Sequence, residues 1–282
     1  MVKIVEYVAM NDGEYGSPLD FRREALAPYL MLGSDCLEVG PFLSPTMSPL
    51  EVNLKTVDYY STEDLRQQAL NIGRNPNDVI HVDYVCKTEK YTDYIEQKFD
   101  AVIANHVAEH VIDFVQYLIM LRAILKKNGL LFLVFPDKRY GFDSFRQDTT
   151  LSHLIYEYLN PDSDGDKLHS LETEMYYDMT YAGGVNDPVR RLDIESLRIS
   201  LDKWHPGVHS HVFQFETIGK RILAPLCAMK IIDFDVVSVT MSHQFGEFAV
   251  VLTAGNQDTD WSDCEIYSPA TDTIPVKALR ND

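Results

Sequence analysis

The stretch FDAVIANHVAEHVIDFVQYLIMLRAILKKNGLLFLVFP, residues 99–136, contains two apolar runs separated by an amphipathic segment. Residues 99–104 and 130–135 are apolar almost throughout, which is typical of parallel strands covered on both faces. The segment between them carries apolar residues at helical spacing: Val107, Val111, Phe114, Val115, Leu118, Leu121 and Leu125. Asn128-Gly129 resembles a helix C-cap. The stretch therefore predicts a strand–helix–strand unit of a parallel sheet.

Further strands are expected on both sides of this unit. Three precede it, at 36–40, 52–57 and 79–82, and two follow it, at 231–240 and 247–253. The link 241–246 is too short for a parallel crossover, so the last two strands are expected to be antiparallel. The sequence predicts an α/β fold: a Rossmann-like, seven-stranded, mainly parallel sheet with an antiparallel last strand and a partly helical insertion after strand five.

This pattern predicts five regions along the chain. An N-terminal helical segment occupies 1–33, and a cofactor-binding core occupies 34–139. Residues 140–210 form an insertion that acts as a substrate lid. Residues 211–255 complete the sheet with a helix and the antiparallel pair, and 256–282 form a polar tail.

Composition excludes several classes of partner. The 282 residues include 43 acids and 25 bases, for a formal charge of −18. Such a surface repels nucleic acid and anionic membrane. No apolar run reaches the ~18–20 residues needed to span a bilayer, and the N-terminus lacks the apolar core of a signal peptide. Four cysteines without a CxxC pair favour reduced thiols, so we expect a cytoplasmic protein.

Polar residues end four successive predicted strands. They are Glu38 and Gly40 after the first strand, Asp58 after the second, Asp83 after the third, and Asn105 and His106 after the fourth. Ligands of open α/β sheets bind at this edge. Carboxylates suit the ribose hydroxyls and the ammonium group of S-adenosylmethionine. A dinucleotide is less well suited, because Gly40 stands alone and Pro41 has no N–H to offer a pyrophosphate.

Five motifs resemble those of class I S-adenosylmethionine-dependent methyltransferases, in the type-11-like group and its PDKRY-containing subgroup. They are CLEVGPFLSP (36–45), TVDYYSTEDLR (56–66), VDY (82–84), FDAVIANHVAEHVID (99–113) and GLLFLVFPDKRYGFD (129–143). VHSHVFQFETI (208–218) resembles a further segment of that subgroup. The missing second glycine of the first motif is a departure from the family pattern.

The resemblance implies a cofactor, S-adenosylmethionine, with S-adenosylhomocysteine as product. It places Glu38, Gly40 and Phe42 at the methionine part of the cofactor. By the same resemblance, Asp58 and Tyr59 meet the ribose, Asp83 and Tyr84 meet the adenine, and Asn105 and His106 lie near the sulfonium.

Two histidines are candidate catalytic bases. His106 directly follows the fourth predicted strand, and His209 lies in the family-like segment. A helix cap or a packing role is the alternative for His106. His205, His209 and His211 also form an HxxxHxH pattern that can bind a metal. We expect no metal, because no fourth ligand is evident and methyl transfer needs none.

A basic cluster follows strand five and is the candidate substrate site. Lys138, Arg139 and Arg146 suit a carboxylate or phosphate, and Tyr140 adds a ring. His211 is a further candidate substrate contact. The alternative for the basic residues is ion pairing with neighbouring acids.

These features predict a methyltransferase acting on a small-molecule substrate of anionic or sugar-like character. The resemblance to carbohydrate-pathway enzymes favours O-methylation of a sugar, nucleotide-sugar or glycan precursor. Three alternatives stay open: N-methylation of a small metabolite or aminosugar, a non-catalytic cofactor-binding subunit, and an NAD-dependent oxidoreductase. A homodimer formed through the insertion is also expected.

Overall fold

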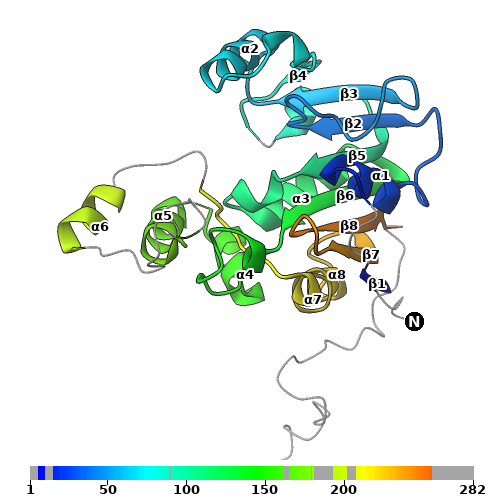
Figure 1. Cartoon of the computed structure of the whole chain (residues 1–282). Helices are drawn as coiled ribbons and strands as arrows, with labels where there is room; N and C mark the ends of the chain where they lie inside the picture. The colour runs from blue at the N-terminus through cyan, green and yellow to red at the C-terminus, as the bar shows by residue number, and fades with distance from the viewer. Residues whose placement is uncertain are drawn as a thin grey trace, which may run out of the picture.

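A computed structural model describes residues 6–9, 15–88, 90–161, 165–178, 180, 193–201 and 208–255. Its strands form one eight-stranded sheet in the order β1-β7-β8-β6-β5-β2-β3-β4 (Figure 1). They are β1 (Glu6–Ala9), β2 (Asp35–Val39), β3 (Asn53–Asp58), β4 (Tyr84–Val85), β5 (Phe99–Asn105), β6 (Leu125–Pro136), β7 (Phe234–Ser242) and β8 (Glu247–Ala254).

Every neighbouring pair in the sheet is parallel except those made by β8, which is antiparallel to both β6 and β7. The predicted Rossmann-like fold with its antiparallel last strand is confirmed. The seven predicted strands are joined by an eighth, β1, which pairs with β7 at the edge.

The third strand lies later in the chain than predicted. Residues 79–82 are not a strand; the strand is β4, in which Tyr84 pairs with Val57 and Val85 with Asp58. The carboxyl end of β4 is therefore Val85, followed by Cys86 and Lys87. This shift decides which side chains reach the edge of the sheet.

Helices cover both faces of the sheet (Figure 1). They are α1 (Pro18–Leu26), α2 (Thr62–Asn71), α3 (Phe114–Ala123), α4 (Leu151–Leu159), α5 (Gly165–Tyr176), α6 (Ile194–Leu201), α7 (Phe215–Thr217) and α8 (Ala224–Ala228). A π-helical stretch, Ile218–Leu223, joins α7 to α8. Pro225 has no N–H to donate, which favours such a widened turn one step before it.

Sequence signals place some helix ends correctly and others not. The capping box at Ser61 and Asp64 starts α2 as predicted. The central helix is shorter than predicted: Asp113 caps α3 through the N–H of Gln116, and α3 ends at Ala123. Asn128, expected at a helix C-cap, lies within β6 with φ 59°.

Alternate side chains of the central strands fill two separate core layers. On β5, Val102 and Ala104 pack with α3 and α8, whereas Ala101 and Ile103 pack with α1. All four are fully buried. This two-sided burial explains why these runs are apolar at every position.

Helices α4, α5 and α6 lie together beyond one end of the sheet, on the left in Figure 1. They fall in the insertion predicted after strand five. The predicted tail, 256–282, lies outside the described residues. Among the described helices, none combines the length and the apolar character needed to cross a bilayer.

Candidate active site

Glu38, near the end of β2, organises the loop that follows this strand. Its buried carboxylate accepts hydrogen bonds from the Thr46 N–H (2.8 Å), the Thr46 hydroxyl (2.9 Å) and the Asn105 amide (3.2 Å). Burial raises the pKa of Glu38 to about 7 despite these donors. Glu38 therefore supports the site from beneath the loop.

The loop after β2 turns at Gly40. Its φ is +63°, in the left-handed region, and its N–H donates to the Val57 carbonyl. A Cβ at Gly40 would stand 3.4 Å from Val107 Cγ2, so the backbone conformation is the main reason for glycine here. Phe42 also has a positive φ (46°), and its ring packs beside Leu65 and other residues of a small core under α2.

Asp58 stands at the end of β3, beside the Gly40 turn. One of its oxygens accepts from the Tyr60 N–H at 2.9 Å, and the residue is only partly buried. Burial raises its pKa above the usual range. Tyr59 is 54% exposed, and Lys87 lies over its ring at 4.4 Å. Asp58 and Tyr59 thus lie at the carboxyl end of β3, and their contact with a ribose stays a prediction.

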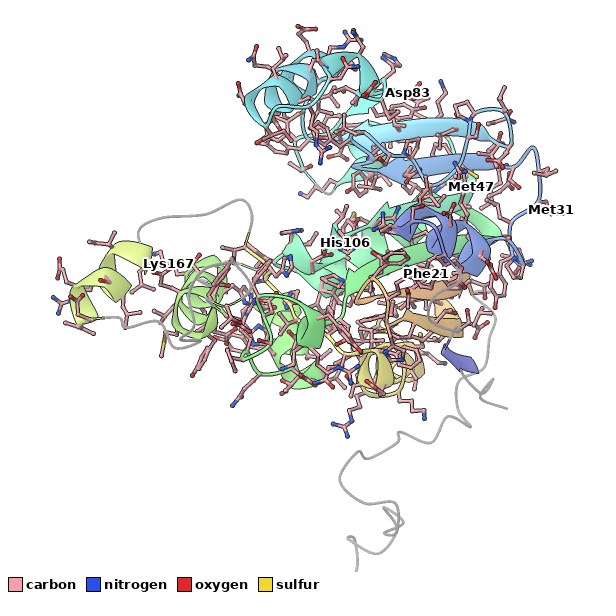
Figure 2. All side chains as sticks on the ribbon, viewed as in Figure 1. Phe21, Met31, Met47, Asp83, His106 and Lys167 are labelled. Atoms are coloured by element: carbon pink, nitrogen blue, oxygen red, sulfur yellow. The ribbon has the colours of Figure 1, made fainter. Side chains whose placement is uncertain are left out.

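Asp83 and Tyr84 do not lie where the sequence predicted. Asp83 precedes β4, pairs with Lys55 at 2.7 Å and accepts from the Thr56 N–H at 3.0 Å. Figure 2 shows Asp83 near α2, well away from His106. Tyr84 is paired within β4, opposite Val57. Cys86 and Lys87 follow the carboxyl end of β4. The prediction that Asp83 and Tyr84 lie beyond this strand end, where they would meet the adenine, is therefore wrong.

Asn105, at the end of β5, bears an orphaned acceptor. Its amide nitrogen donates to the Thr46 hydroxyl (2.6 Å), while its buried Oδ1 has no hydrogen-bond partner among the described residues. With the Asp58 carboxylate, Oδ1 makes this edge rich in acceptors. Such a set fits a cationic, hydroxyl-bearing donor such as S-adenosylmethionine, and Pro41 still offers no N–H for a pyrophosphate.

His106 is held as a cation between two carboxylates. Its φ is +52°, and its Nε2 lies 2.7 Å from Glu247 and its Nδ1 3.4 Å from Glu109. Arg22 binds the same Glu247 with two nitrogens, at 3.0 and 2.7 Å. Burial opposes protonation, yet the two carboxylates raise the pKa of His106 to about 9. Because both ring nitrogens face carboxylates, neither is free to take a proton from a substrate, and the prediction of His106 as base is corrected.

His209 contacts one carboxylate and one histidine, and it is connected to the end of β5 through the turn that contains Glu109 and His110. Glu109 and His110 form a 3₁₀ turn after β5, and their ligand atoms lie within 4.8 Å of one from His209. The His110 and His209 rings pack edge to face at 4.7 Å. His209 Nδ1 lies 2.5 Å from Asp143 Oδ2. The His209–Asp143 pair is therefore a candidate base and its orienting acid.

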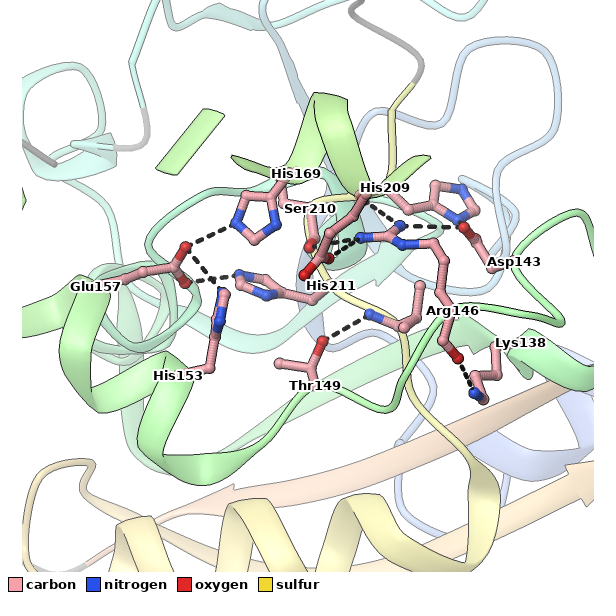
Figure 3. A network of polar contacts seen from close by, with 12 residues as sticks. Lys138, Asp143, Arg146, Thr149, His153, Glu157, His169, His209, Ser210 and His211 are labelled. Atoms are coloured by element: carbon pink, nitrogen blue, oxygen red, sulfur yellow. Dashed lines mark hydrogen bonds and ion pairs between the residues drawn. The ribbon is translucent and has the colours of Figure 1, made fainter. Parts of the chain in front are cut away.

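Arg146 fixes this pair from the buried side (Figure 3). Its guanidinium donates to Asp143 (3.0 Å) and to the backbone carbonyls of His209 (2.6 Å) and Ser210 (3.3 Å). The same group pairs with Glu172 on α5 at 3.1 Å. Only 1% of the Arg146 side chain is exposed. Its role is to position the segment that carries His209, which corrects the prediction of a substrate contact.

The remaining basic residues are also engaged within the protein. Lys138 pairs with Asp148 (2.9 Å) and donates to the Arg146 carbonyl. Arg139 binds the buried Asp137 in two-pronged fashion, at 2.8 and 2.7 Å, and reaches Glu216. The predicted anion-binding cluster is therefore corrected to a set of internal ion pairs, the alternative that the neighbouring acids had suggested.

Tyr140 and His211 complete the predicted substrate set, and the structure separates them. Tyr140 is 45% exposed, and its hydroxyl hydrogen-bonds His243 at 2.8 Å, beside the β7–β8 turn. His211 is fully buried and lies with Glu157, so it does not contact a substrate at the surface. His205, the first member of the HxxxHxH pattern, lies outside the described residues.

The sequence analysis missed the residues that surround His211. They are His153 and Glu157 on α4 and His169 on α5. The only signal was the spacing of His153 and Glu157, which places both on one face of a helix. His169 carries no local signal at all.

The comparison with family models decides the class of the protein. A family model described as a methyltransferase domain matches residues 17–186. The chain belongs to this methyltransferase family. Membership confirms the predicted class I methyltransferase and implies S-adenosylmethionine as the cofactor, which the acceptor-rich edge around Asp58 and Asn105 suits.

Several of the solved structures that resemble the chain at low similarity are described as methyltransferases. One is an S-adenosylmethionine-dependent methyltransferase from Clostridium acetobutylicum ATCC 824, with a TM-score of 0.45, 12% identity, and coverage of 87% of this chain and 94% of that chain. Another is the CcbJ methyltransferase from Streptomyces caelestis, with a TM-score of 0.40, 14% identity, and coverage of 87% and 99%. No curated protein matches the chain.

Proposed function

We propose that this methyltransferase moves a methyl group from S-adenosylmethionine to a hydroxyl of a small polar acceptor. A sugar, nucleotide-sugar or glycan precursor is the leading acceptor class. The observation that supports this proposal is the 2.5 Å contact between His209 Nδ1 and Asp143 Oδ2, beside His110 in the 3₁₀ turn that follows β5.

His209 is arranged as a general base. Asp143 faces Nδ1 and holds the ring in one orientation, which leaves Nε2 to accept a proton. The side chain is 12% exposed, so the ring is sheltered from bulk water without being sealed. A hydroxyl nucleophile needs such a base, whereas a free amine needs none once deprotonated. The base therefore favours O-methylation over N-methylation.

The other edge residues hold the donor. The Asp58 carboxylate suits its ribose hydroxyls, and Asn105 Oδ1 suits a cationic or hydroxyl group of the donor. Gly40 allows the backbone to come close. The bound donor supplies a methyl group already activated by the sulfonium, so the protein needs only to align the acceptor and exclude water.

An aromatic cluster lies beside the proposed base. The Phe142 ring packs against His209, with ring centroids 4.8 Å apart, and stacks on Tyr177, with centroids 5.1 Å apart. Because Phe142 already packs on both rings, this cluster shelters and orients the base. Because Lys138, Arg139 and Arg146 are already paired, these three residues contribute little to binding a phosphate group.

The test is methyl transfer from labelled S-adenosylmethionine to a panel of sugars, nucleotide-sugars and amines. His209→Gln should lower kcat about 10²–10⁴-fold, the usual worth of a general base. Its affinity for S-adenosylhomocysteine, measured by calorimetry, should stay close to that of the wild type. The control is His81→Gln, which alters an exposed histidine away from the pair.

Two results would contradict the proposal. Unchanged kcat in His209→Gln would remove His209 as the base. Methylation of amines alone, with full activity in His209→Gln, would establish the N-methyltransferase alternative.

A further inference from the structure

A second cluster of ionisable side chains lies away from the cofactor edge, inside the helical insertion (Figure 3). Its members are His153 and Glu157 on α4, His169 on α5, and His211 on the segment that precedes α7. Each has a ligand atom within 4.8 Å of one on every other member. The proposed methyl transfer uses none of the four residues.

The three histidines converge on the one carboxylate. Glu157 Oε1 lies 2.7 Å from His169 Nε2 and 3.1 Å from His153 Nε2, and Glu157 Oε2 lies 3.5 Å from His211 Nε2. The three ring centroids are 5.1–5.8 Å apart. A tetrahedral zinc ion with bonds of about 2.0–2.1 Å needs its ligand atoms a few ångströms apart, as the atoms that contact Glu157 are (2.7–3.5 Å).

Hydrogen bonding alone leaves this cluster incompletely satisfied. Glu157, His169 and His211 are 4%, 1% and 0% exposed. Among the described residues, Glu157 Oε2, His153 Nε2 and His211 Nδ1 are buried without a hydrogen-bond partner. Buried polar atoms are rarely left this way, and each deserves a ligand or a partner. His211 Nε2 donates to the Ile112 carbonyl at 2.9 Å, which orients the ring and leaves the unpartnered Nδ1 as the nitrogen of His211 that would bind an ion.

We propose that His153, Glu157, His169 and His211 form a structural binding site for one zinc ion. Three imidazoles and one carboxylate make up a ligand set of the type that zinc accepts, and nitrogen ligands disfavour calcium and magnesium. Four protein ligands close a tetrahedral site and leave no open position for catalysis. The rival explanation is a metal-free network in which protons bridge the same atoms.

The site would join elements that are far apart in the sequence. His211 is two residues from His209, and Ser210 between them accepts a hydrogen bond from Arg146 through its carbonyl. A metal at His211 would anchor this segment to α4 and α5. The proposal does not depend on the nature of the methyl acceptor, so it can fail or succeed independently of the proposed function.

The experiment uses the untagged full chain, purified without added metal. Elemental analysis by mass spectrometry should find about one zinc per chain. Removal of zinc by a chelator should lower Tm by about 5–10 °C, the shift expected for a ligand present at about a hundredfold over its Kd, and added zinc should restore it. Calcium and magnesium should not restore it. Cobalt(II) in place of zinc should show the visible absorption of a tetrahedral site.

Variants assign the site to these residues. Glu157→Gln and His169→Gln keep the size of each side chain, and both should weaken zinc binding at least about 100-fold, since changes outside the ligand shell already cost 10–100-fold. His81 is an exposed histidine outside the cluster, so the His81→Gln variant should bind zinc as the wild type does. If either ligand variant does not fold, the metal content and the cobalt spectrum of the wild type decide the question.

Two outcomes would overturn the proposal. One is a wild type without bound metal whose Tm does not respond to zinc, which would establish the proton-bridged network. The other is equal zinc binding by the wild type and a folded His169→Gln variant, which would place the metal elsewhere.

Discussion

Three histidines near the end of β5 differ in what their neighbours allow them to do. His106 lies between Glu109 and Glu247 and is held as a cation, whereas burial lowers the pKa of His110. His209 has one carboxylate, Asp143, on one ring nitrogen. Residue type alone does not distinguish these roles, since the surrounding charges determine them.

The raised pKa of His106 predicts a stability that depends on pH. The pKa is about 9 in the folded protein, above the ordinary value of 6.5, so the folded state binds this proton more tightly than the unfolded state. The resulting stabilisation is complete below about pH 6.5 and is lost as pH rises through about 9. Urea denaturation of the wild type from pH 6 to 10 should show this loss. His106→Gln should show a flatter profile over the same range, and parallel profiles for the two proteins would contradict the assignment.

At the scale of elements, one buried arginine connects its own loop, the segment 209–210 and helix α5. Arg146 holds Asp143 beside it, the backbone at His209 and Ser210, and Glu172 on α5. These groups come from separate parts of the chain, so the geometry of the His209–Asp143 pair depends on their packing. A guanidinium can be buried at this position because nearly all of its N–H groups donate hydrogen bonds.

Arg146→Met should therefore destabilise the protein by about 3–5 kcal/mol, the usual effect of removing one partner of a buried ion pair. The free energy of unfolding from urea melts measures this change. The Arg146→Met variant should also have a lower kcat, because the backbone at His209 loses the hydrogen bond that positions it. Arg198→Met is the matched control, because the Arg198 side chain is 70% exposed and pairs with Glu195 at the surface, so its effect should stay below about 1 kcal/mol. Equal stability of the two variants would show that Arg146 is not a structural centre.

At the scale of the whole molecule, the parallel sheet brings the functional groups together. Strands β2, β3 and β5 are neighbours and run in the same direction, so the residues that end them, near Glu38, Asp58 and Asn105, meet at one edge. The antiparallel β8 contributes Glu247 from its first residue to the same region, where it holds His106. This edge is suited to one adenosyl donor.

The two cofactors considered for this fold, S-adenosylmethionine and NAD, can be distinguished by how much each ligand raises Tm. S-adenosylhomocysteine at about a hundredfold over its Kd should raise Tm by about 5–10 °C, and NAD at the same concentration should not. Asp58→Ala should reduce affinity for S-adenosylhomocysteine about tenfold through lost charge-assisted hydrogen bonds. Asp93→Ala, at an exposed aspartate, is its control. Stabilisation by NAD alone, or no response to either ligand, would contradict the proposed binding of S-adenosylmethionine at this edge.

Local sequence signals were enough to predict most strands of the sheet and some of the residues at their carboxyl ends. Apolar runs such as 99–104 reflect burial on both faces, and Gly40, Asp58 and Asn105 directly follow or end such runs. The short strand β4 was misplaced because two residues leave no periodic pattern, and this error moved Asp83 to the wrong side of its strand.

The sequence by itself determined the fold class, the methyltransferase family and the polar residues at the strand ends where we propose that the cofactor binds, because these depend on patterns along a few neighbouring residues. Only the tertiary structure decided that His106 is a cation, that the basic residues after β6 are paired internally, and that His153, Glu157, His169 and His211 form one cluster. Charge state and ligand geometry depend on groups that approach from distant parts of the chain, and one-dimensional spacing does not contain those distances.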